Sequence, residues 1–137
     1  MIKAVIFDCF GVVLDIMRGT KIQQTLDLIE ELKPNYALGM LTNVSSRYAL
    51  DQRFEPGQLD ELFSVVVASG DVGWEKPAPE LFIMTAEKLA VRPDECLFID
   101  DIQSFCDVAE KLGMKSFTYV NAAESIVSIK KILAENT

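Results

Sequence analysis

The sequence predicts an α/β fold with one mostly parallel sheet of five strands and helices on both of its faces. Two observations predict it. Short apolar runs of strand length alternate along the chain with segments whose apolar residues recur at helical spacing. Several of these runs end abruptly at polar residues, as expected where buried parallel strands open into loops.

Five apolar runs have the length of strands. They cover residues 4–8, 36–41, 63–68, 96–99 and 115–120. The third run is rich in valine, whose branched side chain favours strands. Since these runs carry few polar residues on either face, we expect helices to cover both sides of the sheet.

Five further segments have the apolar spacing of helices. They cover residues 21–33, 45–53, 79–89, 102–112 and 122–134. Pro34 follows the first helix and Gly113 follows the fourth, and both residue types commonly end helices. Residues 70–79 contain glycines and prolines and are expected to form a loop.

Composition narrows the function classes. The chain has 137 residues, enough for a single domain over 1–137, and a net charge of −8 from 13 basic and 21 acidic residues. An acidic chain without a basic cluster is not expected to bind nucleic acid or an anionic membrane. The absence of histidine excludes the usual Ser-His-Asp and Cys-His mechanisms and a His-ligated zinc site.

The cysteines and the apolar stretches indicate the compartment. Cys9, Cys96 and Cys106 have no paired spacing and are expected to be buried thiols in a reducing environment. No apolar stretch is long enough to span a bilayer, and the first residues lack a signal-peptide pattern. We therefore expect a cytoplasmic protein.

Polar residues at the strand ends are the candidates for chemistry. Asp8 ends the first strand, Thr42-Asn43 follows the second and Asp100-Asp101 follows the fourth, while Lys76 lies in the loop after the third. In a doubly wound sheet the carboxyl ends of the strands share one edge, so these side chains can meet in one crevice. Taken singly, each aspartate or Thr42-Asn43 also fits a helix cap, and Lys76 fits a solvated loop charge.

In sequence order, four segments resemble the motifs of the haloacid dehalogenase superfamily of phosphatases. They are residues 5–12, Leu41-Thr42-Asn43, residues 73–79 with Phe82, and residues 97–101 with Ala109 and Gly113-Met114. The resemblance covers nearly the whole chain. It implies a three-layer Rossmann-like core with strand order 5-4-1-2-3.

The resemblance also implies roles for the side chains. Asp8 would be the nucleophile that forms an aspartyl-phosphate on a phosphorylated small molecule or macromolecule. Thr42 and Asn43 would hold phosphoryl oxygens. Lys76 would offset the negative charge of the phosphoryl group and of Asp8.

The implied cofactor is Mg²⁺, which prefers oxygen ligands. The expected protein ligands are Asp8, the backbone carbonyl of Phe10, and Asp101. Asp100 is expected to bind the metal directly or through water.

Phe10 departs from the family pattern. Phosphatases of this superfamily usually carry a second aspartate there, which protonates the leaving oxygen and later activates water. Losing such a group typically costs on the order of 10²–10⁴ in rate, more for alkyl phosphates than for aryl or acyl phosphates. Glu75, Asp15 or a water molecule are alternative proton donors.

An aromatic residue at this position also resembles the branch that displaces halide from 2-haloacids without a metal. The Asp100-Asp101 pair argues against that reaction, because these acids repel a substrate carboxylate when no cation is present.

The second departure is a missing cap. Most relatives insert a helical cap domain between the first and second motifs, whereas here residues 15–20 join the first strand almost directly to the next helix. The chain is therefore expected to be a naturally capless member or a core from which the cap was deleted. An open crevice suits a large substrate or a partner lid, and apolar surface left by the cap can form a homodimer. Both departures also fit a non-catalytic core that acts as a scaffold.

Overall fold

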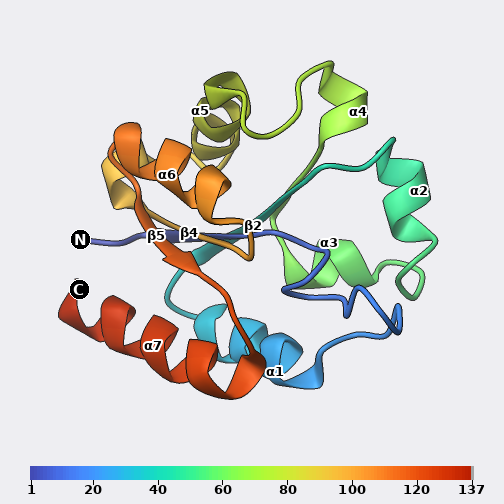
Figure 1. The fold of residues 1–137 in the computed structure, drawn as a ribbon, viewed down its shortest axis with the longest axis horizontal. Helices are drawn as coiled ribbons and strands as arrows, with labels where there is room; N and C mark the ends of the chain where they lie inside the picture. Colours follow the sequence, from blue (N-terminus) through green and yellow to red (C-terminus); the bar gives the residue numbers. More distant parts are fainter. Residues whose placement is uncertain (137) are drawn as a thin grey trace.

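The computed structural model describes residues 1–136 and contains a five-stranded sheet between two layers of helices (Figure 1). The strands are β1 Ala4–Phe7, β2 Ala37–Thr42, β3 Val65–Ala68, β4 Cys96–Asp100 and β5 Lys115–Thr118. They lie in the order β3-β2-β1-β4-β5, and all four pairings between them are parallel. The predicted order 5-4-1-2-3 is therefore confirmed, read from the opposite edge.

The helices form two layers around this sheet. They are α1 Gln23–Leu32, α2 Arg47–Asp51, α3 Gln58–Leu62, α4 Ser69–Val72, α5 Pro79–Lys88, α6 Gln103–Lys111 and α7 Ala122–Glu135. Helices α1 and α7 cover one face, and α5 and α6 cover the other (Figure 1). Val5 and Phe7 of β1 pack into the first core cluster, and Ala4 and Ile6 into the second. This alternation follows from the two-residue period of a strand.

The structure differs from the predicted elements between β2 and α5. The helix expected over 45–53 is shorter, because the Ser46 side chain accepts a hydrogen bond from Ala49 N at 3.0 Å and starts α2 there. Helix α3 was not predicted, and α4 occupies part of the expected loop over 70–79. These helices have five and four residues, too few for apolar periodicity to reveal them. A 3₁₀ helix, Pro93–Glu95, also precedes β4.

The topology brings three strand ends together. Strand β1 lies between β2 and β4, so Asp8 emerges beside Thr42 on one side and Asp100 on the other. Within residues 1–136, no helix combines the length and the hydropathy that crossing a bilayer requires.

Candidate functional site at the carboxyl edge of the sheet

A buried lysine lies between two carboxylates from neighbouring strands. Lys76 Nζ donates to Asp8 Oδ1 at 2.9 Å and to Asp100 Oδ2 at 2.6 Å, and also to the carbonyl of Leu41 at 3.1 Å. Only 1% of its side chain is exposed. Lys76 is therefore not a solvated loop charge, and its ammonium partly compensates two acids that would otherwise be buried together.

The residual negative charge affects the protonation of Asp8. Burial raises the pKa of Asp8 from its ordinary 3.8 to about 7, with Asp100 adding to the rise and Lys76 opposing it. Burial and the nearby carboxyl of Asp100 also raise the pKa of Asp101. The site therefore favours an additional positive charge, because that charge would stabilise all three carboxylates in their ionised form.

Asp101 completes an acidic cluster with Asp8 and Asp100. One carboxylate oxygen from each of the three lies within 4.8 Å of the others. Gly11 permits this arrangement, because it has a φ of +92° and a Cβ there would collide with the Asp101 carboxylate. Three converging oxygen donors suit a hard divalent cation such as Mg²⁺, so the donor set fits the expected metal.

The hydroxyl of Thr42 has no partner in the protein. Among residues 1–136, Thr42 Oγ1 is the only buried side-chain polar atom without a hydrogen bond. A buried hydroxyl left unpaired costs about 1–3 kcal/mol. Thr42 lines the same cavity as Asp8, so an oxygen of a bound ligand can satisfy it there.

Asn43 holds the backbone of Lys76. Its side-chain oxygen accepts from Lys76 N at 2.8 Å, and its side-chain nitrogen donates to Lys76 O at 3.1 Å. Sequence reasoning assigned Asn43 to phosphoryl oxygens and missed this contact, which fixes the loop that carries the lysine. The two residues are 33 positions apart, and no local pattern indicates the pairing.

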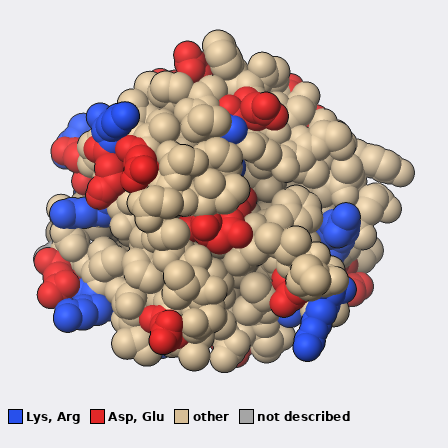
Figure 2. All heavy atoms as spheres, viewed as in Figure 1, with Lys and Arg blue, Asp and Glu red and all other residues tan. Residues whose placement is uncertain are grey.

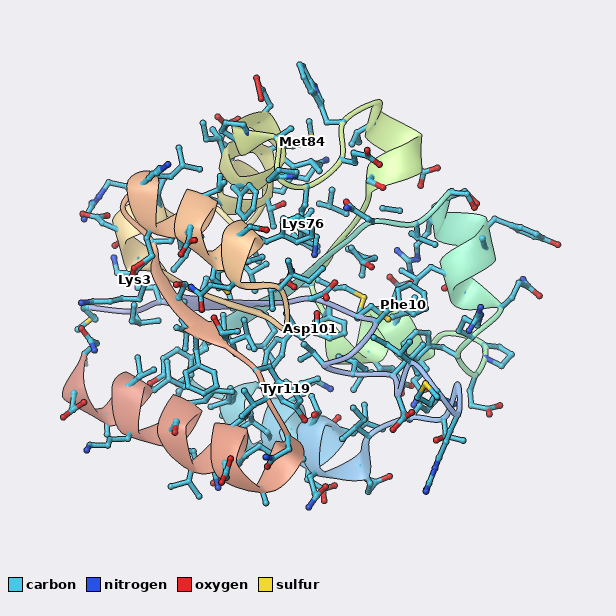
Figure 3. The ribbon with its side chains drawn as sticks, in the orientation of Figure 1. Lys3, Phe10, Lys76, Met84, Asp101 and Tyr119 are labelled. Atoms are coloured by element: carbon cyan, nitrogen blue, oxygen red, sulfur yellow. The ribbon has the colours of Figure 1, made fainter. Side chains whose placement is uncertain are left out.

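A cavity of about 230 Å³ opens at this edge of the sheet. Its lining brings together Asp8, Phe10, Thr42, Asn43, Lys76 and Asp101 from the predicted set, with Ile16, Ile102 and Phe105 in addition. In Figure 3, Lys76 and Tyr119 lie on opposite sides of Asp101, and Phe10 lies beside it. The same view in Figure 2 has an acidic patch at its centre, surrounded mainly by uncharged residues.

Sequence reasoning missed the aromatic and apolar walls of this cavity. Phe105 follows the Asp100-Asp101 pair by one helical turn, and its ring centroid lies 5.3 Å from Lys76 Nζ. The Phe10 ring is contacted by the guanidinium of Arg53, 5.6 Å from the ring centroid. The spacing of Phe105 indicated a core position, so only the fold shows that it faces the site.

The segment between β1 and α1 is short and turn-rich. Residues 8–22 form turns and two isolated bridges, which pair Phe10 with Leu14 and Leu14 with Lys21. The Thr25 hydroxyl donates to the carbonyl of Val12 at 2.7 Å and ties this segment to α1. Ile16 of this segment lines the cavity and is 65% exposed.

Two curated relatives are phosphatases. The chain is 32% identical over 90 residues to phosphatase MT3486 of Mycobacterium tuberculosis, covering 66% of this chain and 42% of the relative. It is 31% identical over 104 residues to D-ribitol-5-phosphate phosphatase of Bacteroides thetaiotaomicron, covering 72% of this chain and 50% of that protein. The chain thus spans half or less of the length of these relatives.

A solved structure and a family model agree on the fold. A HAD family enzyme from Bacteroides thetaiotaomicron, in complex with magnesium and inorganic phosphate, superposes with a TM-score of 0.75 at 19% identity over 90% of this chain and 96% of that one. The family model described as haloacid dehalogenase-like hydrolase matches residues 13–119. Asp8 and Phe10 precede this matched range, so their assignment depends on the motif resemblance and on the geometry. The chain belongs to the haloacid dehalogenase-like hydrolases.

Proposed function

We propose that this chain is a Mg²⁺-dependent phosphatase-type hydrolase with Asp8 as its nucleophile. The observation that carries the proposal is the position of Asp8 in the cavity. Its carboxylate accepts from the ammonium of Lys76 and forms an acidic cluster with Asp100 and Asp101, and the unpartnered hydroxyl of Thr42 lines the same cavity. This combination offers a nucleophile, donors for phosphoryl oxygens and a ligand set for a cation.

The metal would be held by Asp8, Asp101 and the backbone carbonyl of Phe10, with Asp100 as a direct or water-mediated ligand. When bound, Mg²⁺ supplies positive charge that offsets the phosphoryl oxygens and keeps the carboxylates ionised.

The reaction has two displacement steps. A carboxylate oxygen of Asp8 attacks phosphorus, the bond from phosphorus to the leaving oxygen breaks, and an aspartyl-phosphate forms. Water then attacks that phosphorus and the bond to Asp8 breaks, which releases phosphate and restores the carboxylate. The Thr42 hydroxyl donates to a phosphoryl oxygen, and Lys76 balances the charge on Asp8 throughout.

Phe10 restricts the substrates. Its side chain cannot protonate a leaving oxygen, so the leaving group departs as an anion or takes its proton from water. Aryl and acyl phosphates meet this requirement better than alkyl phosphates. The phosphorylated small molecule on which a relative acts, D-ribitol 5-phosphate, is an alkyl ester and should react slowly here.

We further propose that residues 1–137 are one capless domain.

Phe10 also favours a second candidate function, a binding core or scaffold that holds Mg²⁺ and phosphate without turnover. A homodimer through the apolar residues near the cavity is a related proposal, and sedimentation of the purified chain would detect it.

The test is release of 4-nitrophenol from 4-nitrophenyl phosphate, with Mg²⁺ and with a chelator. We expect turnover that requires the metal and is abolished by Asp8→Asn. Asp107→Asn, an exposed aspartate on α6, is the matched control and should retain the wild-type rate. No turnover together with a Mg²⁺-dependent rise in melting temperature would instead support the binding core. Halide release from a 2-haloacid without metal would overturn both.

A further inference from the structure

A second hollow adjoins the proposed catalytic cavity. This groove has a volume of about 460 Å³ and shares Ile16 and Asp101 with the cavity of about 230 Å³. It extends from Asp101 past Tyr119 and Val120 to the start of α7. In Figure 3, Tyr119 marks this direction on the side of Asp101 away from Lys76. The two hollows are therefore adjacent, with Asp101 of the acidic cluster and Ile16 at their junction.

The leaving group of a phosphate attacked by Asp8 is expected to point toward this junction. Asp8 lines the cavity and is only 6% exposed. In an in-line displacement the leaving oxygen lies opposite the attacking oxygen, so it faces the opening of the cavity. Ile16, which is 65% exposed, lines that opening and the groove alike.

The walls of the groove are apolar where they are most accessible. Met17 is 93% exposed and Val120 is 67% exposed. Two of the polar side chains that line it are engaged within the protein. Asp15 Oδ1 accepts from the backbone nitrogens of Met17 and Arg18, both at 2.9 Å, and the Tyr119 hydroxyl lies 3.2 Å from Thr25 Oγ1. The groove thus offers apolar contact beside the exposed polar side chains of Gln24 and Asn121, which also line it.

Charge in the groove excludes anionic groups. Its charged lining residues in the described chain are Asp15 and Asp101, and no lysine or arginine lines it. A carboxylate or second phosphate there would meet negative charge without a compensating cation. A ring that carries no ionised substituent in the bound ester fits this field.

We propose that this groove binds the aromatic ring of an aryl phosphate monoester, so that the substrate class is phosphorylated phenols. The inference rests on the proposed phosphatase function and on two independent observations. Phe10 demands a leaving group that departs without an acid, which phenols do better than alkyl alcohols. The groove adjoins the cavity in which that group is released, and it presents exposed apolar side chains and no cationic side chain.

The test compares phenyl phosphate with 2-naphthyl phosphate, with acetyl phosphate as a substrate that carries no ring. The second ring of naphthol adds apolar area that the groove would cover, so we expect a KM ~5–10-fold lower than for phenyl phosphate. Val120→Asp should remove most of this preference. Val127→Asp is the matched control, because Val127 is 68% exposed on α7 but does not line the groove. The control should keep the wild-type KM ratio.

The outcomes separate the groove from the catalytic proposal. Hydrolysis of all three phosphates with equal KM for the two aryl esters would refute the groove and leave the phosphatase function standing. Failure to hydrolyse any of them would refute the phosphatase function. In that case, calorimetry with the Asp8→Asn variant and Mg²⁺ measures the affinity for each aryl phosphate and tests whether the groove binds the ring. Tighter binding of 2-naphthyl phosphate than of phenyl phosphate would support it, and equal affinity would overturn it.

Discussion

Replacing Lys76 by methionine should destabilise the protein strongly, because it removes the ammonium that contacts two buried carboxylates. Methionine keeps most of the apolar length of the side chain and ends one atom short of the ammonium, which lies 5.7 and 5.3 Å from the ring centroids of Phe98 and Phe105. The loss of stability therefore measures mainly the removal of the charge and not the creation of a cavity. Lys76 Nζ now lies 2.9 Å from Asp8 Oδ1 and 2.6 Å from Asp100 Oδ2.

The magnitude depends on pH. Removing one partner of a buried ion pair typically costs about 3–5 kcal/mol. The pKa of Asp8 is raised to about 7, so below pH 7 this group mostly holds a proton and Asp100 is the main uncompensated charge in the variant. Above pH 7 wild-type Asp8 ionises beside Lys76, whereas in the variant it stays protonated or ionises at a cost.

The sign follows from proton binding. A folded-state pKa above the ordinary 3.8 favours the folded protein at low pH, and this contribution is lost as the pH rises toward 7. In the variant the pKa of Asp8 rises further. The difference in unfolding free energy between wild type and variant therefore grows with pH. Since one pKa unit corresponds to about 1.4 kcal/mol, we expect losses of about 3 kcal/mol at pH 6 and about 4 kcal/mol at pH 8.

Urea unfolding of metal-free protein at the two pH values measures these losses. Lys88→Met, at an exposed position on α5, is the matched control and should stay within about 0.5 kcal/mol of wild type. Adding Asp100→Asn to Lys76→Met should recover part of the loss, because one uncompensated charge disappears. A loss below about 1 kcal/mol at both pH values would refute the buried ion-pair reasoning.

Three further substitutions test the site. Thr42→Val should leave the stability of the metal-free protein unchanged or raise it by up to about 1 kcal/mol in urea unfolding, because it removes an unpaired buried hydroxyl. The same substitution should weaken phosphate binding at least severalfold, as measured by calorimetry. Gly11→Ala should weaken Mg²⁺ binding by roughly tenfold or more because its Cβ displaces Asp101. Gly73→Ala, with a similar φ of +77° but no atom nearby, controls for backbone strain, and equal effects would count against the displacement. Phe10→Asp should raise steady-state turnover of alkyl phosphates by about 10²-fold and that of aryl phosphates less, and an equal gain on both would contradict the missing-acid explanation.

The strand ends of the site could be predicted from the sequence because parallel strands impose a shared edge. Asp8, Thr42 and Asp100 each end an apolar run, and adjacent parallel strands necessarily place those ends together. The acidic cluster of Asp8, Asp100 and Asp101 follows from the same rule. The position of Lys76 required the family resemblance, since nothing local indicates that a loop lysine is buried.

The remaining features depend on contacts between distant residues. Two hydrogen bonds join the Asn43 side chain to the Lys76 backbone, and Arg53 contacts the Phe10 ring. Both contacts join segments that no periodic pattern links. Helix α3 is a similar case, because its five residues are stabilised by burying Leu59 and Leu62 rather than by a local signal. The groove beside Asp101 is likewise formed by three separate segments, which only the folded chain brings together.

The most direct test of the central claim is to locate the phosphoryl group on the protein during turnover. Wild-type protein would be mixed with 4-nitrophenyl phosphate and Mg²⁺, quenched in acid, digested and analysed by mass spectrometry. The account predicts a phosphoryl group on Asp8 that is absent without Mg²⁺ and absent in Asp8→Asn. Turnover that persists in Asp8→Asn, or a phosphoryl group on any other residue, would contradict it.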